Sequence, residues 1–482
     1  MVLPPVDHEC SLQKIVTDLA DRLAKLEHEN AQLKKTLFGA RSERSAKMPR
    51  VKAGEPPTAD DVKAKRRARA TAAKDQTPTL RIEHRVPDEL RRCSACGRTD
   101  LLPMGGGKVT SLWEFVPARF VRNEHVQEVL RCGCGGCIVT APGAPRVIEG
   151  GKYGASFLAH LAVAKCADHL PIYRLEKEFA RKGVPIARST MNELLHRSSA
   201  LLKPIWSRLL TVVCARPVVL ADETRLRILK DATGKPKTGY VWTFGAADED
   251  GDFDVAYQFA DSRSGSTPKA LLEGTTGVLL VDGYSGYNAI EKVSSRRRAA
   301  CLAHVRRYFF DALRTAPIAQ EALDLITEIY RVEHAAREQQ LSEAAHLVFR
   351  KRRAGPIRER LKLWLEHQRA RQLPKSPIGE AIRYTLGQWD ELGVFLTDAT
   401  VPLDNNASER SLRRIAIGRK NYLFVGDVAS GKSLAGLYSL VATCESRGIN
   451  PFDYLTDVLA RVQDHPARAV DELLPGAWAA AT

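Results

Sequence analysis

The sequence has no apolar run that approaches the roughly 18 residues needed for a membrane span. Its first residues, MVLPPVDHECSLQK, also lack the charged and apolar regions of a secretory signal. These two absences argue against membrane insertion and against export. We therefore expect a soluble, cytoplasmic protein with no membrane partner.

Acidic residues are too few to balance the basic ones. The 482 residues include 57 Asp and Glu against 73 Lys and Arg, a net charge of +16. This excess favours a polyanionic partner, although a merely soluble basic protein is the simpler alternative. The charge is clustered, because residues 41–74 carry eleven Lys or Arg and no apolar period. We predict a disordered basic linker over 41–80 that contacts phosphates without reading bases.

Eight positions near the start of the chain follow a heptad repeat. They alternate spacings of four and three residues: Leu12, Val16, Leu19, Leu23, Leu26, Asn30, Leu33 and Leu37. An Asn at one core position costs stability but fixes the register and favours a parallel two-stranded coil. We predict a coiled-coil helix over 1–40 that joins chains through residues 12–37 into a homodimer or higher oligomer. The alternative is one helix packed on its own chain.

Five of the ten cysteines fall in two clusters. Cys93 and Cys96 form a CxxC pair, and Cys132, Cys134 and Cys137 follow in LRCGCGGCIV. Two thiolate pairs are typical of a closed structural Zn²⁺ site that stabilises a small module. The second pair is ambiguous, and the neighbouring glycines favour Cys134 as one ligand. We predict one zinc ion in a DNA-binding ribbon over 81–147; the alternative is a degenerate, empty site.

Residues 148–210 have the pattern of a helical hairpin. Ile172, Leu175 and Phe179 line one face, GVPIA interrupts the pattern, and Thr190 with Glu193 has the spacing of a capping box. Two helices joined by a short turn suggest a helix-turn-helix, although such hairpins are common in ordinary bundles. The expected DNA contacts at the start of its second helix are Arg188, Ser189 and Asn192.

Three carboxylates lie where strands and a helix are expected to bring them together. Asp222 and Asp282 each interrupt or close a run of β-branched residues and leucine, in VVLADETRLRIL and GVLLVDGYSGYN. Glu409 follows the capping residues Asn405 and Asn406, which places it in the first turn of a helix. Oxygen ligands of this kind suit Mg²⁺, and two such ions stabilise the attacking and leaving oxygens of a phosphodiester displacement.

One motif points to a different class of protein. The segment GDVASGKS over 426–433 matches the phosphate-loop pattern GxxxxGKS. Only 49 residues follow Ser433, which is too few for the parallel sheet that such a loop needs. We interpret Gly431 and Lys432 as a basic turn near DNA and keep a phosphate-loop ATPase of a mobile element as an alternative.

The stretches ADET, VDGYSGYN, CLAHVRRYF, NNASERSLRR and IGRKNYLF, in this order, resemble those of the insertion-sequence-66 family of bacterial DDE transposases. The resemblance implies an RNase H-like catalytic domain with Asp222, Asp282 and Glu409 as the triad. The long gap before Glu409 then needs a helical insertion, and Ala322, Leu325, Ile326, Ile329 and Tyr330 form a matching helical stripe.

The resemblance also implies what the protein does. It would cleave the ends of its element and join them to target DNA, with two Mg²⁺ ions that Mn²⁺ can replace, near the nucleoid and with accessory proteins of the same element as partners. A zinc-containing DNA-binding protein with a dead catalytic site is the other alternative. Further DNA contacts are expected at His304, Arg410, Arg413, Arg414, Arg419, Lys420 and Lys432.

The expected fold is multidomain α/β, with an RNase H-like mixed sheet flanked by helices. A coiled coil, a zinc ribbon and a helical DNA-binding hairpin precede it. The remaining expected boundaries are 211–316 for the first part of the catalytic domain, 317–400 for the helical insertion, 401–440 for its second part and 441–482 for a C-terminal helical segment.

Overall fold

The computed structural model describes residues 120, 121, 123, 129–131, 138–140, 146–229, 234–288, 290 and 293–481. The predicted coiled coil, the basic linker and the two cysteine clusters lie outside these residues. Two short antiparallel strands, β1 (Val129–Arg131) and β2 (Ile138–Thr140), precede and follow the second cysteine cluster in the chain. No helix in the described part is both long and apolar enough to cross a membrane.

In the described part of the chain, four helices precede the main sheet. They are α3 (Ala155–Cys166), α4 (Ile172–Arg181), α5 (Arg188–Leu201) and α6 (Lys203–Ala215). The predicted apolar face of α4 is confirmed, since Ile172, Leu175 and Phe179 are all buried.

The capping box predicted at Thr190 is wrong, because α5 begins two residues earlier, at Arg188. A carboxylate from the preceding helix takes the role of the cap. The backbone N of Arg188 donates to Glu176, 3.3 Å away, and its Nε lies 3.0 Å from the same side chain.

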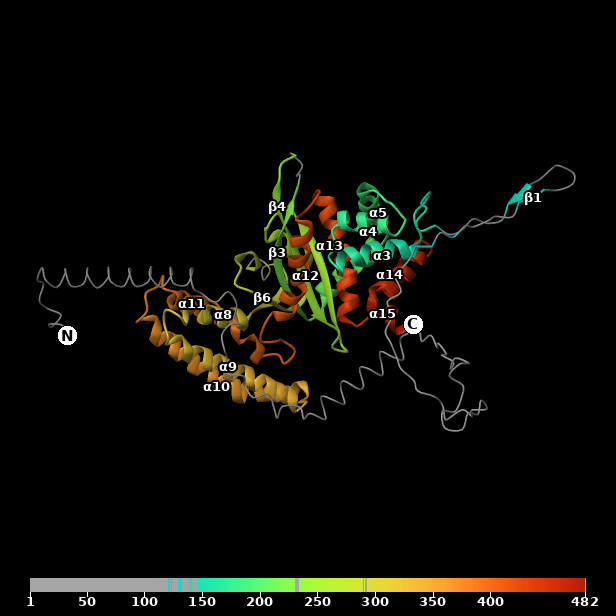
Figure 1. Cartoon of the computed structure of the whole chain (residues 1–482). Coiled ribbons are helices and arrows are strands. Elements are labelled where there is room, and N and C mark those ends of the chain that lie inside the picture. The colour runs from blue at the N-terminus through green and yellow to red at the C-terminus, as the bar shows by residue number, and fades with distance from the viewer. Residues whose placement is uncertain are drawn as a thin grey trace, which may run out of the picture. The chain divides into compact units, whose positions relative to one another are not determined.

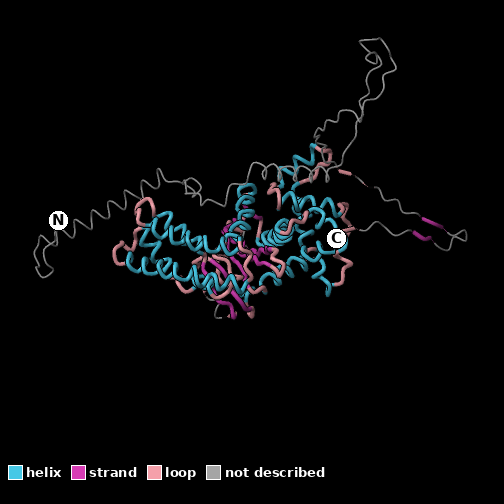
Figure 2. The backbone as a smooth tube through the Cα atoms, turned by 90° about the horizontal axis from the view of Figure 1, so that it is seen from below, coloured by secondary structure: helices cyan, strands magenta, loops and turns pink. Residues whose placement is uncertain are grey.

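The central sheet is mixed, in the order β5-β4-β3-β6-β7. The antiparallel half consists of β3 (Val218–Ile228), β4 (Lys237–Ala247) and β5 (Phe253–Ala260). The strands β6 (Thr276–Val281) and β7 (Ser295–Ala300) continue from β3 in parallel. Helix α7 (Ser266–Leu272) lies between β5 and β6 in the chain, and the 3₁₀ turn η3 (Ser285–Tyr287) lies between β6 and β7. In Figure 2 the strands lie in the middle, with helices to either side in that view.

Strand β3 has a third partner at its far end, after β4 and β6. The two-residue strand β8 (Phe424–Val425) pairs with Arg227 and Ile228, whereas β6 pairs only with Val218 to Leu220. Between β6 and β8, the edge of β3 contacts a helix, α12 (Asn406–Tyr422), which runs beside it in Figure 1.

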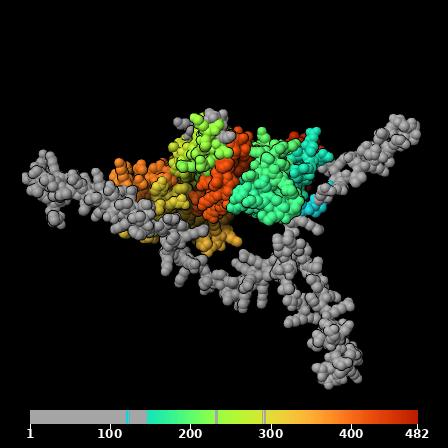
Figure 3. All heavy atoms as spheres, turned by 45° about the horizontal axis from the view of Figure 1, so that its top comes forward, coloured from blue at the N-terminus to red at the C-terminus, as the bar shows by residue number. Residues whose placement is uncertain are grey.

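The edge strand β5 is covered by α13 (Val428–Ser446). The Oγ1 atom of Thr443 accepts from the backbone N of Val255, and Oγ of Ser439 accepts from that of Tyr257. These bonds occupy donors that would otherwise attract another strand. The space-filling view in Figure 3 shows the orange-red C-terminal helices between the yellow-green strands and the green helices α3 to α6. The chain ends with α14 (Pro451–Arg461), η6 (Ala467–Leu473) and α15 (Pro475–Ala481).

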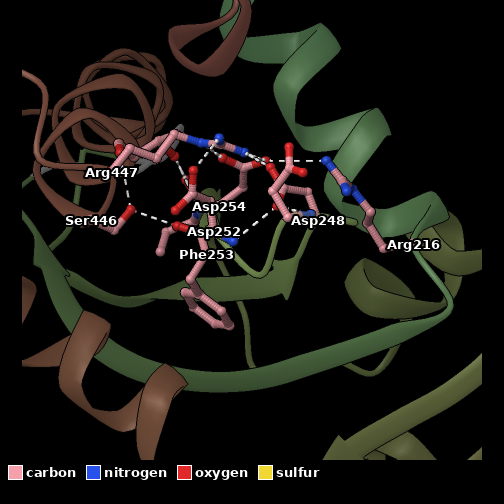
Figure 4. Close-up of polar contacts among 10 residues, drawn as sticks. Arg216, Asp248, Asp252, Phe253, Asp254, Ser446 and Arg447 are labelled. Atoms are coloured by element: carbon pink, nitrogen blue, oxygen red, sulfur yellow. Dashed lines mark hydrogen bonds and ion pairs between the residues drawn. The ribbon is translucent and has the colours of Figure 1, made fainter. Parts of the chain in front are cut away.

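Arg447, which follows α13, ties that helix to the turn between β4 and β5. Its guanidinium lies within 2.5–3.2 Å of carboxylate oxygens of Asp248, Asp252 and Asp254 (Figure 4). Arg216 approaches Asp254 from the end of α6, at 3.4 Å. This network joins the beginning and the end of the folded domain through one half-buried cluster.

The predicted helical insertion is present between β7 and α12. Helix α8 (Leu302–Ala312) precedes the predicted range 317–400. Within that range lie α9 (Ala319–Glu338), α10 (Glu343–Arg369), α11 (Pro377–Leu386) and η5 (Glu391–Leu396). The predicted stripe is buried at Ala322, Leu325, Ile326 and Ile329, and α9 and α10 run side by side in Figures 1 and 2. Between them Arg350 and Glu333 form a buried ion pair at 2.8 Å.

Candidate functional site

The first two carboxylates come from neighbouring parallel strands. Leu220 of β3 is in register with Leu280 of β6, and Asp222 and Asp282 each lie two residues further along. Parallel strands in register bring such positions to the same level of the sheet. The β-branched residues and leucines before each aspartate are buried on both faces, which is why these segments form central strands.

Glu409 lies in the first turn of α12, as predicted. The residue at its N-cap position is Asn405, which is fully buried, but its side chain does not cap the helix. Instead Nδ2 of Asn405 donates to the carbonyl oxygen of Ala221 at 2.8 Å, one residue before Asp222. The helix is thereby fastened to the strand that carries the first aspartate.

The carboxylates of this region interact electrostatically. Burial raises the pKa of Asp222 to about 7, against a hydrogen bond of 2.8 Å from the backbone N of Glu223 that lowers it. The negative charges of Glu223, Asp282 and Glu409 raise the pKa of Asp222 further. A surplus of negative charge in a buried place is relieved by a bound cation. The oxygen donors of Asp222, Asp282 and Glu409 therefore fit Mg²⁺ in chemical type.

Asp282 is held by the loop after β6 and by a side chain of β7. Its Oδ1 accepts from the backbone N of Tyr284 at 2.9 Å, and its carbonyl oxygen accepts from Nη2 of Arg298 at 2.9 Å. The same Nη2 atom donates to Gln388, just after α11 of the insertion. A side chain at Gly283 would meet Nε2 of Gln388 at 2.6 Å. The helical insertion thus packs directly on the backbone beside Asp282.

His304, on α8, lies against Glu409. Its Nδ1 atom is 3.6 Å from Oε1 of Glu409, and this buried nitrogen has no hydrogen-bond partner among the residues that the structure describes. The contact favours a role in ordering the carboxylate over that of an isolated polar residue on α8. Nearby, Sγ of Cys301 accepts from the backbone N of Asn405 at 3.2 Å.

The Cys301 thiol is a weak candidate for a metal ligand, although donor atoms of Cys301, His304 and Glu409 lie within 4.8 Å of one another. Burial raises the pKa of this thiol to about 12. Since the thiolate is the form that binds metals, the protonated sulfur serves as a hydrogen-bond acceptor.

Glu223 was not found by analysis of the sequence. Its side chain, 2% exposed, projects to the opposite face of β3 from Asp222. There it accepts from Nη2 of Arg263 at 2.6 Å and from the hydroxyl of Tyr287 at 2.8 Å. The Arg263 guanidinium also lies 3.9 Å from the centre of the Tyr284 ring. Glu223 therefore anchors the loop that follows Asp282. The alternation of side chains in a strand predicts that Glu223 faces away from Asp222. It does not identify Arg263 as the partner of Glu223, because the two residues are 40 positions apart in the chain.

The phosphate-loop motif takes a different structure from the one predicted. Helix α13 begins at Val428, so Gly431 and Lys432 are helical and the predicted basic turn is wrong. The reason is a strong N-cap: Oδ1 of Asp427 accepts from the backbone N of Ser430 at 2.7 Å. This carboxylate occupies the helix N-terminus at which a nucleotide phosphate would have to bind.

The segment before this motif is mostly helix. In IGRKNYLF, α12 continues to Tyr422, and only Phe424 and Val425 form a strand. Leu423 separates the two with a positive φ of 66°.

The basic residues of α12 fall into two groups. Arg414 forms an ion pair with Glu445, and Nη1 of Arg419 donates to Oγ1 of Thr224 and to the carbonyl oxygen of Arg225. These two arginines hold α12 against its neighbours. The side chains that remain exposed are Arg410, Arg413 and Lys420.

At the start of α5, the three residues predicted to contact DNA are all exposed: Arg188, Ser189 and Asn192. Lys432 is exposed as well. DNA contacts at all these positions remain predictions.

Models of known protein families match most of the chain. The transposase IS66 family matches residues 150–433, the IS66 C-terminal element matches residues 439–475, and the zinc-finger binding domain of transposase IS66 matches residues 91–135.

Several curated relatives come from Sinorhizobium fredii. The uncharacterized protein y4jD is 32% identical over 410 residues, which cover 82% of this chain and 80% of the relative. The uncharacterized protein y4hP is 30% identical over 495 residues, with 94% and 88% covered. The uncharacterized protein y4qI is 34% identical over 356 residues, with 70% and 65% covered.

Proposed function

Because the chain belongs to the transposase IS66 family, we propose that it cleaves the ends of its insertion element and joins them to target DNA, with Asp222, Asp282 and Glu409 as the catalytic carboxylates. The observation that carries this proposal is that burial, and then the negative charges of neighbours that include Asp282 and Glu409, raise the pKa of Asp222. DNA binding follows from the family and from its zinc-finger domain.

The proposed chemistry consists of two displacements at phosphorus. In the first, a water oxygen attacks a phosphodiester at the element end, the bond from phosphorus to the 3′ oxygen breaks, and a free 3′-hydroxyl results. In the second, that hydroxyl attacks a phosphodiester of the target, and the bond to the target's 3′ oxygen breaks. Bound Mg²⁺ would supply the positive charge that activates the attacking oxygen and stabilises the leaving one.

Each carboxylate has a separate task in this scheme. Asp222 and Asp282, on adjacent rigid strands, would hold the cations at a fixed level of the sheet. Glu409, on a helix fastened to β3 through Asn405, would complete the second position, and His304 would order it. We further propose that the coiled coil over 12–37 pairs two chains, so that two element ends are held together.

The test is cleavage of element ends by single isosteric variants. Asp222→Asn, Asp282→Asn and Glu409→Gln should each abolish Mg²⁺-dependent cleavage and keep DNA affinity within a few-fold, since each change removes a metal ligand without altering volume. Glu249→Gln and Asp250→Asn, exposed acids in the turn after β4, are the matched controls and should cleave normally. Cleavage by one of the three variants would remove that residue from the catalytic set. An inactive wild-type chain that binds its ends would favour the alternative of a dead catalytic site.

A further inference from the structure

One face of the sheet is open beyond the catalytic region. Arg225 and Arg227 alternate along β3 with buried residues, so both project to the same face as Glu223. Tyr240 of β4 is the register partner of Arg225, and Phe424 of β8 is that of Arg227. Since paired residues project to the same face, these four side chains form one strip, here called the β3 strip.

The β3 strip combines exposed cations with two aromatic side chains, of which Phe424 is exposed and Tyr240 is half-buried against the core. Arg225 and Arg227 are exposed, and neither guanidinium has a hydrogen-bond or ion-pair partner in the part of the chain that the structure describes. Phe424 is 43% exposed, although it lies in a strand. At its border Leu423 is 61% exposed and has a φ of 66°, which a leucine rarely adopts. The fold therefore keeps large apolar side chains in solvent beside unpaired positive charge, at a cost in stability.

This composition fits a single strand of DNA better than a duplex. Duplex DNA presents phosphates at its surface and keeps its bases stacked inside, so an exposed phenylalanine would meet charge. Unpaired bases stack on aromatic side chains, and arginines bind the phosphates of the same strand. The strip lies on the strand that carries Asp222 but on its opposite face: Arg227 is five residues beyond Asp222, roughly 17 Å at about 3.3 Å per residue.

We propose that the β3 strip binds single-stranded DNA, with phosphates at Arg225 and Arg227 and bases stacked on Tyr240 and Phe424. The inference rests on the proposed transposase function, in which the strip would hold a strand separated from its complement on the far side of β3 from the catalytic carboxylates. It assigns a separate DNA site on the face of β3 opposite α12.

The test measures the affinity of the full-length Asp222→Asn chain, which would bind DNA without cutting it. The probes are a fluorescent oligothymidylate of about 16 nucleotides and a duplex of the same length. Phe424→Leu and Tyr240→Leu keep an apolar side chain and should weaken single-strand binding about tenfold, the loss expected for one stacked base. Duplex binding should change by less than twofold.

The arginines are tested by salt dependence. Arg225→Ala with Arg227→Ala should reduce the slope of log affinity against log salt by about 1.4, since each phosphate contact on a single strand contributes about 0.7. The matched control is Arg352→Ala with Arg353→Ala, which removes two exposed charges from α10 and should leave the slope almost unchanged. An equal effect in both double variants would attribute the binding to net charge and overturn the assignment.

A second measurement locates the DNA directly. Photocrosslinking of an oligonucleotide that contains 5-iododeoxyuridine should give peptides with Tyr240 or Phe424. Crosslinks confined to other regions would overturn the proposal, and so would equal losses of single-strand and duplex affinity. If the strip variants instead changed the oligomeric state and left DNA affinity intact, the strip would be a protein interface. If variants of the β3 strip cleaved element ends normally, only the proposed role of the strip would be contradicted. If variants of Asp222, Asp282 or Glu409 remained active, only the catalytic assignment would be contradicted.

Discussion

The Nδ2 atom of Asn405 lies 2.8 Å from the carbonyl oxygen of Ala221, so the residue before α12 is bonded to the residue before Asp222. The two residues are 184 positions apart in the chain. Through this bond the helix that carries Glu409 is aligned with the strand that carries the first aspartate. The relationship makes Asn405 a positioning residue for the proposed site.

Replacement of Asn405 with Ala should lower cleavage strongly. The change leaves a buried carbonyl unsatisfied, which costs about 1–3 kcal/mol of unfolding free energy, and it releases Glu409 from its alignment. Asn406→Ala is the matched control, because Asn406 is the adjacent residue of the same type and its side chain makes no bond to β3. Urea unfolding and cleavage are both measured; equal activity of the two variants would contradict the positioning role.

The raised pKa of Asp222 predicts how the metal-free protein responds to pH. The folded chain keeps this proton up to about pH 7, whereas the unfolded chain loses it near its ordinary pKa of about 3.9. Between these values the folded state binds more protons, so the contribution of Asp222 to stability falls as pH rises.

Asp222→Asn has no proton to lose. In EDTA it should gain stability relative to wild type between pH 5 and pH 8, by up to a few kcal/mol at about 1.4 kcal/mol per pKa unit. The control is Asp250→Asn, an exposed aspartate. Urea unfolding of wild type and Asp222→Asn is measured at pH 5 and at pH 8. If the difference in unfolding free energy between the two proteins is the same at both pH values, the pKa of Asp222 is not raised.

Replacement of Arg350 should lower the stability of the protein more than replacement of other residues of the insertion. It binds Glu333 with two nitrogens and donates to the carbonyl oxygens of Phe395, Asp398 and Val401. Arg350→Met removes the most buried partner of Glu333, which keeps only Arg337 at 3.3 Å and His346 at 3.1 Å, and it leaves three carbonyl oxygens without this donor. The change should cost about 3 kcal/mol of unfolding free energy.

The exposed pair Arg360–Glu328 provides the control for Arg350. Its atoms lie 3.0 Å apart with side chains 60% and 36% exposed, so Arg360→Met should cost at most about 1 kcal/mol. Urea unfolding measures the loss of unfolding free energy in both variants. Similar losses would mean that the buried ion pair of Arg350 contributes no more to stability than the exposed pair of Arg360.

If the two cysteine clusters form the predicted zinc site, the purified protein should carry one zinc ion per chain. Cys93→Ser with Cys96→Ser should lose both the zinc and end binding, because structural zinc supplies the folding energy of a small module. Cys10→Ser lies outside the two clusters and is the control. Metal analysis of Cys132→Ser and Cys134→Ser would then identify the ambiguous ligand. Zinc-free protein that binds its ends normally would refute the assignment.

Calorimetry with ATP tests the phosphate-loop alternative. We expect no binding, because Asp427 already occupies the N-terminus of α13. Lys432→Ala should therefore change only DNA binding, with a salt slope lower by about 0.9 if Lys432 contacts one duplex phosphate. Micromolar ATP affinity that disappears in Lys432→Ala would restore the ATPase alternative.

Local patterns predicted the elements that carry the site. The runs that end near Asp222 and Asp282 are strands, Glu409 is in the first turn of a helix, and Leu325 and Ile329 are buried in the insertion. Each of these features depends on residues within a few positions of one another. Short-range hydrophobic periodicity and capping preferences were therefore sufficient.

Contacts between distant residues were not predictable in this way. The sequence offered no sign that Asn405 would bond to Ala221 or that Glu223 would bond to Arg263. The capping box at Thr190 failed for the same reason, because Glu176 from another helix stabilises the start of α5. Tertiary partners decided these details, and a single sequence does not display them.

The dependence of β3 and β5 on α12 and α13 has a consequence for protein synthesis. A ribosome that has made the chain as far as the insertion has produced both aspartates but not the helices that complete the sheet. Such a nascent chain lacks Glu409 and exposes the donors of β5 that Thr443 and Ser439 later occupy. Unpaired strand edges promote aggregation. A prematurely terminated chain is thus prone to aggregation, and it lacks the third carboxylate of the proposed site.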